Sequence, residues 1–265
     1  MTGPSRYLGV PTEFVRTIGS TNDEVLRRAM QGAPEGLVIA TDEQTAGRGR
    51  HGRSWWDAPG RSLLFSVLLR PGLPLARFPL LGMAMACAVV EAGGVATGQE
   101  LAVKWPNDVM HRGRKLCGVL AESRPGASGH VLVVGTGINV NQTAEEFPPE
   151  LRDRATSLRS AGGGRVLDRE EVLTAVLESF ERYRALAAIE GAEALREAIL
   201  PRLPQPGSRV TVQTPEGRVE GTVEAVLATG ALLIRDAAGA LFPVVAGEIP
   251  FDAAGNGPDA VGGTA

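Results

Sequence analysis

The sequence predicts an α+β domain followed by a small antiparallel β-barrel. Apolar stripes with helical spacing alternate with β-rich runs as far as about residue 200, the pattern of a mixed sheet flanked by helices. A proline-rich stretch at 201–206 marks a boundary, and short alternating segments follow it. We therefore expect a main domain at 1–203, a barrel domain at 204–251 and a disordered Gly- and Ala-rich tail at 252–265.

The main domain is expected to open with a helix after Ser20. Thr21 and Glu24 have the spacing of a capping box, and Gly32 is expected to end the helix. The segment 42–61 is Gly- and Arg-rich and aperiodic, and a loop of this length is unusual unless it binds something. Further helices are predicted at 78–92, 168–188 and 192–200, and strands at 37–41, 62–69, 101–105, 115–122 and 131–140.

The barrel domain is predicted from the spacing of its turns. Residues 209–249 contain short alternating segments separated by turn-like clusters at 214–217, 228–230 and 236–239. This spacing is typical of a small antiparallel barrel, and we expect an SH3-like one.

Composition restricts the classes of function. The 265 residues are 43% hydrophobic and 22% charged, with a formal net charge of −3. The chain is therefore not expected to coat nucleic acid or an anionic membrane, and any anion site must be local. Cys87 and Cys117 lie in apolar stretches without metal-ligand spacing, so we expect reduced core thiols. We expect no signal peptide and no membrane-spanning segment, and we take the cytoplasm as the location.

Lysine is rare in this chain. Of the 27 Lys and Arg residues only Lys104 and Lys115 are lysines, and both fall in one short stretch. An ammonium is a compact point charge that fits a crowded carboxylate or phosphate site, whereas a guanidinium is a planar fork. The stretch is therefore a candidate site, with chance and codon bias as the alternative explanation.

A glycine–arginine loop, residues 47–52, formally matches the Gly-x-Gly-x-x-Gly fingerprint of dinucleotide-binding folds. That fingerprint needs a helix at its third glycine, but two tryptophans and a Pro-Gly pair follow here. We interpret the loop as an anion clamp in which Arg48, Arg50 and Arg53 bring charge to phosphate or carboxylate oxygens. Trp55 could stack on a purine. A solvated basic loop or a nucleic-acid contact is the alternative.

The motif Lys104-Trp105-Pro106-Asn107-Asp108 lies at the end of a predicted strand, where α/β proteins place many ligand sites. Asp108 could hold Mg²⁺ or accept a proton, with Asn107 orienting either. Lys115 follows seven residues later, and a hairpin between the two segments would bring Asp108 and Lys115 together. The alternative is an ordinary surface ion pair. A second strand is expected to end in Gly135-x-Gly137-Ile138-Asn139.

Taken in order, these segments resemble the biotin protein ligase family across about residues 20–158. The resemblance implies a main domain similar to class II aminoacyl-tRNA synthetases, a mixed sheet with flanking helices, which would be the catalytic biotin- and ATP-binding domain at 1–203. It also implies an SH3-like C-terminal domain. Both implied folds agree with the pattern of predicted helices and strands.

The resemblance further implies a role for each matching residue. Ser20, Thr21, Asn22 and Gln44 would hold the ureido ring of biotin. Asp108 would act on the acceptor lysine, and the segment 142–158 would close over the nucleotide. The other implied biotin-binding residues are Gly47, Arg48, Gly49, Arg50, Lys115 and Gly118. The implied adenylate-binding residues are Arg50, Arg53, Trp55, Asn107, Lys115 and Asn139. The implied catalytic residues are Lys115, Asp108, Arg48 and Arg50.

The expected function is therefore ATP-dependent activation of biotin as biotinyl-5′-AMP, with Mg²⁺, and transfer of biotin to a lysine of a biotin carboxyl carrier protein or domain. Lipoate-protein ligation and non-catalytic binding of a nucleotide or RNA are the alternatives. A repressor that binds DNA through an N-terminal helix-turn-helix is not expected, because only about nineteen residues precede Ser20. The sequence leaves a monomer and a homodimer open.

Overall fold

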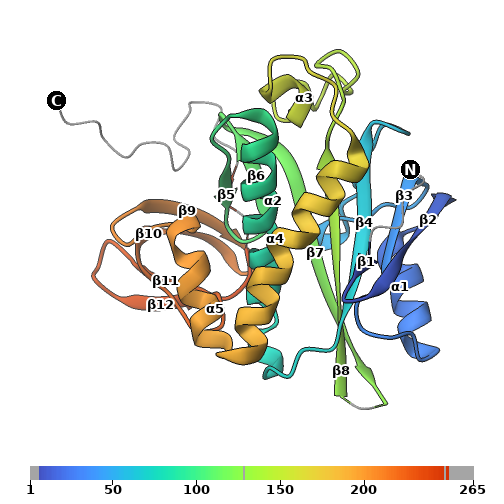
Figure 1. Cartoon of the computed structure of the whole chain (residues 1–265). Coiled ribbons are helices and arrows are strands. Elements are labelled where there is room, and N and C mark those ends of the chain that lie inside the picture. The colour runs from blue at the N-terminus through green and yellow to red at the C-terminus, as the bar shows by residue number, and fades with distance from the viewer. Residues whose placement is uncertain (1–5, 128, 248, 251–265) are drawn as a thin grey trace.

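The computed structural model describes residues 6–127, 129–247 and 249–250. Within these residues the chain forms two β-sheets and five α-helices (Figure 1). One hydrophobic cluster joins the two sheets and four of the helices, and a second lies between the N-terminal helix and the first sheet. The helices are α1 (Thr21–Met30), α2 (Pro79–Thr97), α3 (Leu158–Ala161), α4 (Arg169–Ile189) and α5 (Ala192–Ile199), with short 3₁₀ turns η1 (Arg50–Gly52), η2 (Leu75–Arg77) and η3 (Leu200–Arg202).

The first sheet has eight strands in the order β1-β2-β3-β4-β8-β7-β6-β5. The pair β2–β3 runs parallel and the other pairs run antiparallel, so the sheet is mixed, as predicted. Its strands are β1 (Arg6–Tyr7), β2 (Val10–Ile18), β3 (Val38–Gln44), β4 (Ser62–Leu69), β5 (Ala102–Lys104), β6 (Asp108–His111), β7 (Arg114–Gly126) and β8 (Gly129–Asn139).

Helices cover both faces of the first sheet. Helix α1 contacts β3, β4 and β8, whereas α2 contacts β5, β6, β7 and β8 and is itself covered by α4 (Figure 1). Every residue of the central strand β4 is buried, which explains its almost continuous apolar sequence. The site described below lies on the α1 side.

The second sheet has four antiparallel strands in the order β12-β11-β10-β9, which are β9 (Arg209–Thr214), β10 (Gly217–Val226), β11 (Leu232–Arg235) and β12 (Leu241–Val244). Its β10–β11 turn is attached to the first domain at three points. The backbone oxygens of Val226, Ala228 and Gly230 accept hydrogen bonds from Arg196 Nη1 (3.0 Å), Arg77 Nη1 (2.6 Å) and Trp105 Nε1 (2.9 Å). The expected tail at 252–265 lies outside the described residues.

Two sequence expectations differ from the structure near the N-terminus. Strands β1 and β2 were not predicted, because β2 mixes polar and apolar residues and is only partly buried. The capping box is wrong: Ser20 is the N-cap, Thr21 bonds to Gln44 and Ser66, and Glu24 pairs with arginines of its own helix.

No membrane-spanning segment was expected, and one apolar helix has to be weighed against that expectation. By length and composition Leu75–Thr97 is long and apolar enough to cross a membrane, although 72% of its most apolar window is buried inside the fold. Such burial is typical of the core helix of a globular domain.

Candidate functional site

A pocket opens on the α1 side of the first sheet, where the start of α1, the loop after β3 and strands β6, β7 and β8 meet. Gly47 and Asn139 are the two predicted site residues outside its wall. The wall includes the others: Ser20, Thr21, Asn22, Gln44, Arg48, Gly49, Arg50, Arg53, Trp55, Asn107, Asp108, Lys115 and Gly118.

The predicted hairpin between Asp108 and Lys115 is confirmed. Strands β6 and β7 pair with Asp108 opposite Gly118 and Met110 opposite Lys115, and a register shift leaves Leu116 unpaired. This β-bulge turns Lys115 onto the face that Asp108 occupies, because in a regular strand residues 115 and 118 would point to opposite faces. Lys115 Nζ lies 2.7 Å from Asp108 Oδ1, with the Asp108 side chain 12% exposed.

Trp55 forms a flat apolar wall beside this ion pair. A Cβ atom on Gly137 would lie 2.6 Å from Trp55 Cε2, and one on Gly118 would lie 2.8 Å from Trp55 Cζ3. Only glycine at both positions lets the indole lie this close to the sheet. Lys115 Nζ is 5.4 Å from the ring centroid. The pocket therefore places a cation beside an aromatic surface.

The glycine–arginine loop closes on itself rather than opening a helix. Arg48 bridges to Ser54, and the Trp55 N–H donates to the Gly47 oxygen at 3.0 Å. Gly47 thus forms the base of the loop, which explains its place outside the pocket wall. The loop contains only the 3₁₀ turn η1, and a strand, not a helix, is the next element, so the structure as well as the sequence excludes the dinucleotide-fold fingerprint.

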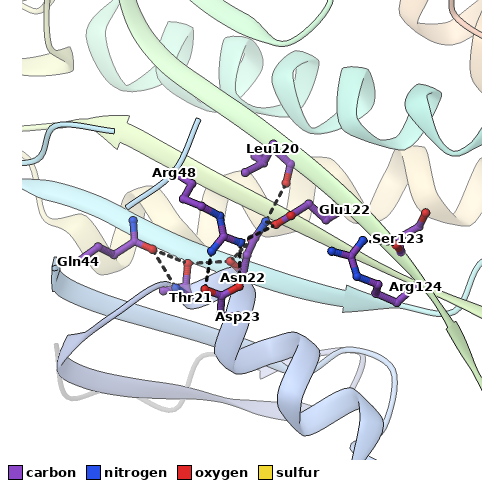
Figure 2. A network of polar contacts seen from close by, with 10 residues as sticks. Thr21, Asn22, Asp23, Gln44, Arg48, Leu120, Glu122, Ser123 and Arg124 are labelled. Atoms are coloured by element: carbon purple, nitrogen blue, oxygen red, sulfur yellow. Dashed lines mark hydrogen bonds and ion pairs between the residues drawn. The ribbon is translucent and has the colours of Figure 1, made fainter. Parts of the chain in front are cut away.

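Two arginines of the loop already donate hydrogen bonds to other groups of the protein. Both guanidinium Nη atoms of Arg48 donate to the Asp23 carboxylate, and Nη2 lies 3.3 Å from Glu122 Oε2 (Figure 2). The hydrogen bonds to Asp23 raise the pKa of the Arg48 guanidinium. Arg50 Nη1 donates to Asn107 Oδ1 at 3.2 Å and to the backbone oxygen of Gly247, beyond β12, at 3.0 Å. The segment that follows the second sheet therefore contacts the loop directly.

The start of α1 carries a polar cluster. Gln44 Oε1 accepts from the Thr21 N–H at 2.8 Å, and Ser66 Oγ lies 2.7 Å from Thr21 Oγ1 and 2.6 Å from Asn22 Oδ1. Asn22 Nδ2 donates to Glu122 Oε2 at 2.7 Å (Figure 2). Because the Gln44 oxygen is used by Thr21, its NH₂ group remains to face a ligand.

Asn139 is buried outside the pocket wall, where its side chain holds residues 142–158, which we call the second loop. Its Nδ2 donates to the Thr156 oxygen at 3.0 Å, and its Oδ1 accepts from Gln142 Nε2 at 3.2 Å. The same loop pairs with the backbone of Lys115, whose N–H donates to the Arg154 oxygen at 2.7 Å and whose oxygen accepts from the Thr156 N–H at 2.9 Å. A movement of this loop would therefore also shift the backbone of Lys115.

No group of three His, Cys, Asp or Glu side chains that could hold a metal ion occurs within the described parts of the chain. Asp108 offers one carboxylate, and the Lys115 ammonium already lies against it. These residues do not fit a resident Mg²⁺ site. A single carboxylate does suit an ion that arrives with nucleotide phosphates, which is how Mg²⁺ is commonly bound.

Sequence reasoning missed Asp23, Ser66 and Glu122. Ser66 carried a signal, because it is a polar residue in the middle of a strand that is otherwise strongly apolar. Asp23 and Glu122 are indistinguishable from surface acids in the sequence. Their role follows from the fold, which brings both carboxylates to Arg48.

Comparison with known proteins gives a consistent assignment. Residues 14–139 match the Biotin/lipoate A/B protein ligase family and residues 207–251 match the Biotin protein ligase C terminal domain. The biotin--[acetyl-CoA-carboxylase] ligase of Mycobacterium tuberculosis is 34% identical over 89% of this chain and 87% of its own length. The bifunctional ligase/repressor BirA of Bacillus spizizenii is 41% identical over 68% of this chain. The chain spans about half the length of such BirA relatives, 56% and 52% for two of them.

Solved structures agree. The biotin protein ligase from Aquifex aeolicus in complex with biotin and ATP superposes with a TM-score of 0.76 at 30% identity, over 90% of this chain and 97% of the other. Together these similarities place the chain in a family of protein ligases. The chain belongs to the biotin protein ligase family.

Proposed function

We propose that this protein is a biotin--[biotin carboxyl-carrier protein] ligase, which makes biotinyl-5′-AMP from biotin and ATP and transfers the biotin to a lysine of a carrier domain of acetyl-CoA carboxylase or a related carboxylase. The observation that carries the proposal is the pocket in which Lys115, Asp108, Trp55 and the arginine loop meet. The Mycobacterium tuberculosis and Paracoccus denitrificans relatives, named for this activity, support it.

In the proposed complex the ureido ring of biotin lies at the start of α1. Ser20, Thr21, Asn22 and Gln44 supply the polar groups that such a ring needs, and all four line the pocket. The carboxylate end of biotin lies toward Lys115 and Gly118, under Gly47–Arg50. The adenine stacks on Trp55, while Asn107, Arg53 and Asn139 act on the nucleotide side, Asn139 through the second loop.

The first step converts a poor acyl donor into a good one. An oxygen of the biotin carboxylate attacks the α-phosphorus of ATP, and the bond to pyrophosphate breaks. Lys115, Arg48 and Arg50 spread the negative charge of the transition state. Asp108 would be the carboxylate available to a Mg²⁺ ion bound by the ATP phosphates, and that ion would supply further stabilisation of the phosphate charge. Arg48 must exchange Asp23 for a substrate anion, so binding opens an existing ion pair.

The second step uses the same pocket. The acceptor lysine amine attacks the acyl carbon, AMP leaves with the bonding electron pair, and the amine proton passes to Asp108. Closure of the second loop (residues 142–158) over the nucleotide keeps water from the acyl-adenylate until the acceptor arrives. The contacts of that loop with Lys115 and Asn139 support this role.

The finer description of the fold belongs to the same proposal. We place the catalytic domain at 1–203, with the sheet of a class II aminoacyl-tRNA synthetase, and an SH3-like domain at 204–251. The match of the C-terminal family to residues 207–251 supports that boundary. A cytoplasmic location is supported by two free, buried cysteines.

Two other functions are less well supported. Lipoate ligation would suit the broader family that matches residues 14–139, but the relatives and solved structures described above are named for biotin. A non-catalytic binder of nucleotide or RNA would use the arginine loop alone. It would assign no role to the partly buried Lys115–Asp108 pair.

The test is incubation of the full chain with ATP, Mg²⁺ and biotin, with pyrophosphate release and biotin on a carboxyl carrier domain as readouts. The proposal expects both, and no pyrophosphate when lipoate replaces biotin. Lys115→Ala should lose pyrophosphate release by about 100-fold or more while keeping its circular dichroism spectrum. Binding of ATP without biotin-dependent pyrophosphate release would refute the proposal in favour of a binding protein.

A further inference from the structure

Ser66 is a buried hydroxyl that lies beneath the ring-binding end of the pocket. It is 0% exposed, in the centre of β4, where it pairs with Ile39 of β3 and Gly135 of β8. Its Oγ lies within 2.7 Å of both Thr21 Oγ1 and Asn22 Oδ1. It does not belong to the pocket wall, so its effect on a ligand has to pass through these two residues.

The acceptors on β7 decide which groups donate and which accept in the hydrogen bonds among Asn22, Ser66 and Thr21. Asn22 Nδ2 donates to the Leu120 backbone oxygen at 3.2 Å and to the Glu122 carboxylate at 2.7 Å. Both partners can only accept, so the amide NH₂ must face β7 and Oδ1 must face Ser66. An amide oxygen cannot donate, and therefore the Ser66 hydroxyl proton points to Asn22.

The proton of Thr21 is placed by the same reasoning. Since the Ser66 proton is used on Asn22, the 2.7 Å contact between Ser66 Oγ and Thr21 Oγ1 needs the proton of Thr21. Gln44 Oε1 is already held by the Thr21 N–H at 2.8 Å and is farther from Thr21 Oγ1, at 3.1 Å. The Thr21 oxygen then turns its lone pairs toward the pocket and can accept an N–H from a ligand.

The sheet is shaped for this arrangement. A Cβ atom on Gly135, the β8 partner of Ser66, would lie 2.1 Å from Asn22 Oδ1. Glycine at 135 therefore lets the Asn22 amide reach down to the Ser66 hydroxyl. Both hydrogens of Asn22 Nδ2 are bound to acceptors on β7, so the Asn22 side chain can meet a ligand only through Oδ1.

We propose that Ser66 is a positioning residue for the biotin ring. It donates a hydrogen bond to Asn22 and accepts one from the Thr21 hydroxyl. Thr21 can then accept a hydrogen bond from a ureido N–H, while Gln44 donates one to the ureido oxygen. This inference rests on the proposed function. We expect Ser66 to affect only the ring site, because its side-chain hydrogen bonds are made with residues at the start of α1 and not with Lys115 or Trp55.

The test is Ser66→Ala in the full chain, with biotin affinity measured by calorimetry without ATP and with steady-state constants for both substrates. We expect the biotin Kd and KM to rise about tenfold, equivalent to about 1.4 kcal/mol. The KM for ATP and the kcat at saturating biotin should stay within about twofold. Ser66→Thr, which keeps the hydroxyl, should restore biotin affinity, and Ser66→Cys, with its weak donor, should lie between the two.

The matched control is Ser179→Ala, which removes another buried hydroxyl, on α4, that donates to the Glu91 carboxylate. It should lower stability without changing either KM. If the wild-type protein binds biotin but Ser66→Ala binds it equally well, the inference is wrong although the function stands. If the wild-type protein neither binds biotin nor releases pyrophosphate, the proposed function itself fails. Should Ser66→Ala not fold, a Ser66→Cys variant with wild-type affinity would likewise overturn the inference.

Discussion

The ammonium of Lys115 lies 2.7 Å from the carboxylate of Asp108 because a β-bulge at Leu116 rotates Lys115 onto the pocket face of β7. Two oppositely charged groups are thus held together in the pocket wall, on a largely apolar sheet. In the proposed reaction they serve different steps, since Lys115 stabilises charge on the phosphate and Asp108 receives a proton later. The two steps can therefore be separated experimentally.

The first prediction concerns Asp108→Asn. The variant should keep biotin-dependent pyrophosphate release within a few fold, because the amide preserves size and one oxygen that Mg²⁺ can use, and Lys115 remains. Transfer to the carrier lysine should slow by about 100-fold, the usual effect of losing a general base. Rapid-quench measurement of pyrophosphate and of biotinylated carrier in a single turnover separates the steps. Equal loss in both would assign Asp108 to adenylation instead, as a phosphate or metal contact.

The second prediction concerns the Trp55 wall. Gly137→Ala places a methyl group 2.6 Å from Trp55 Cε2, a distance that forces the indole off the sheet. We expect the KM for ATP to rise at least tenfold, since the stacking surface moves. Gly82→Ala in α2 is the control, because its nearest neighbour would be Ala121 Cβ at an ordinary 3.4 Å. That variant should keep wild-type kinetics and gain stability of up to about 1 kcal/mol from helix propensity.

How far the sequence predicts this site depends on the kind of residue. The Asp108–Lys115 pair was predictable because a short turn at Arg112-Gly113 joins adjacent strands, so local spacing determines the contact. The β-bulge was not, since a single extra residue leaves no periodic signal. The carboxylates at Asp23 and Glu122 come to Arg48 from sequence positions 25 and 74 residues away, and only the tertiary fold decides such pairs. Asn139 was predicted beside the nucleotide, but its side chain holds the second loop from behind.

The third prediction concerns the junction between the two sheets. Trp105 Nε1 donates to the Gly230 oxygen at 2.9 Å, in a site where Trp105 is 1% exposed. Trp105→Phe keeps most of the ring but leaves that buried oxygen without its donor, which costs about 1–3 kcal/mol. Urea unfolding should show a lower midpoint with an unchanged m-value. A variant as stable as the wild type would show that the oxygen finds another donor.

The fourth prediction concerns the two thiols. Burial raises the pKa of the Cys87 thiol to about 12, and burial also raises the pKa of the Cys117 thiol. The thiolate is the reactive form, so almost none is present at pH 8 and neither sulfur is accessible. A chromogenic disulfide reagent should therefore release no colour from the native protein and two equivalents after denaturation. Cys117 lies on β7 opposite Ile138, directly under the pocket, and a native reaction there within minutes would mean that the β7–β8 floor opens on that timescale. Cys87→Ala, which leaves Cys117 as the single thiol, would identify the sulfur that reacts.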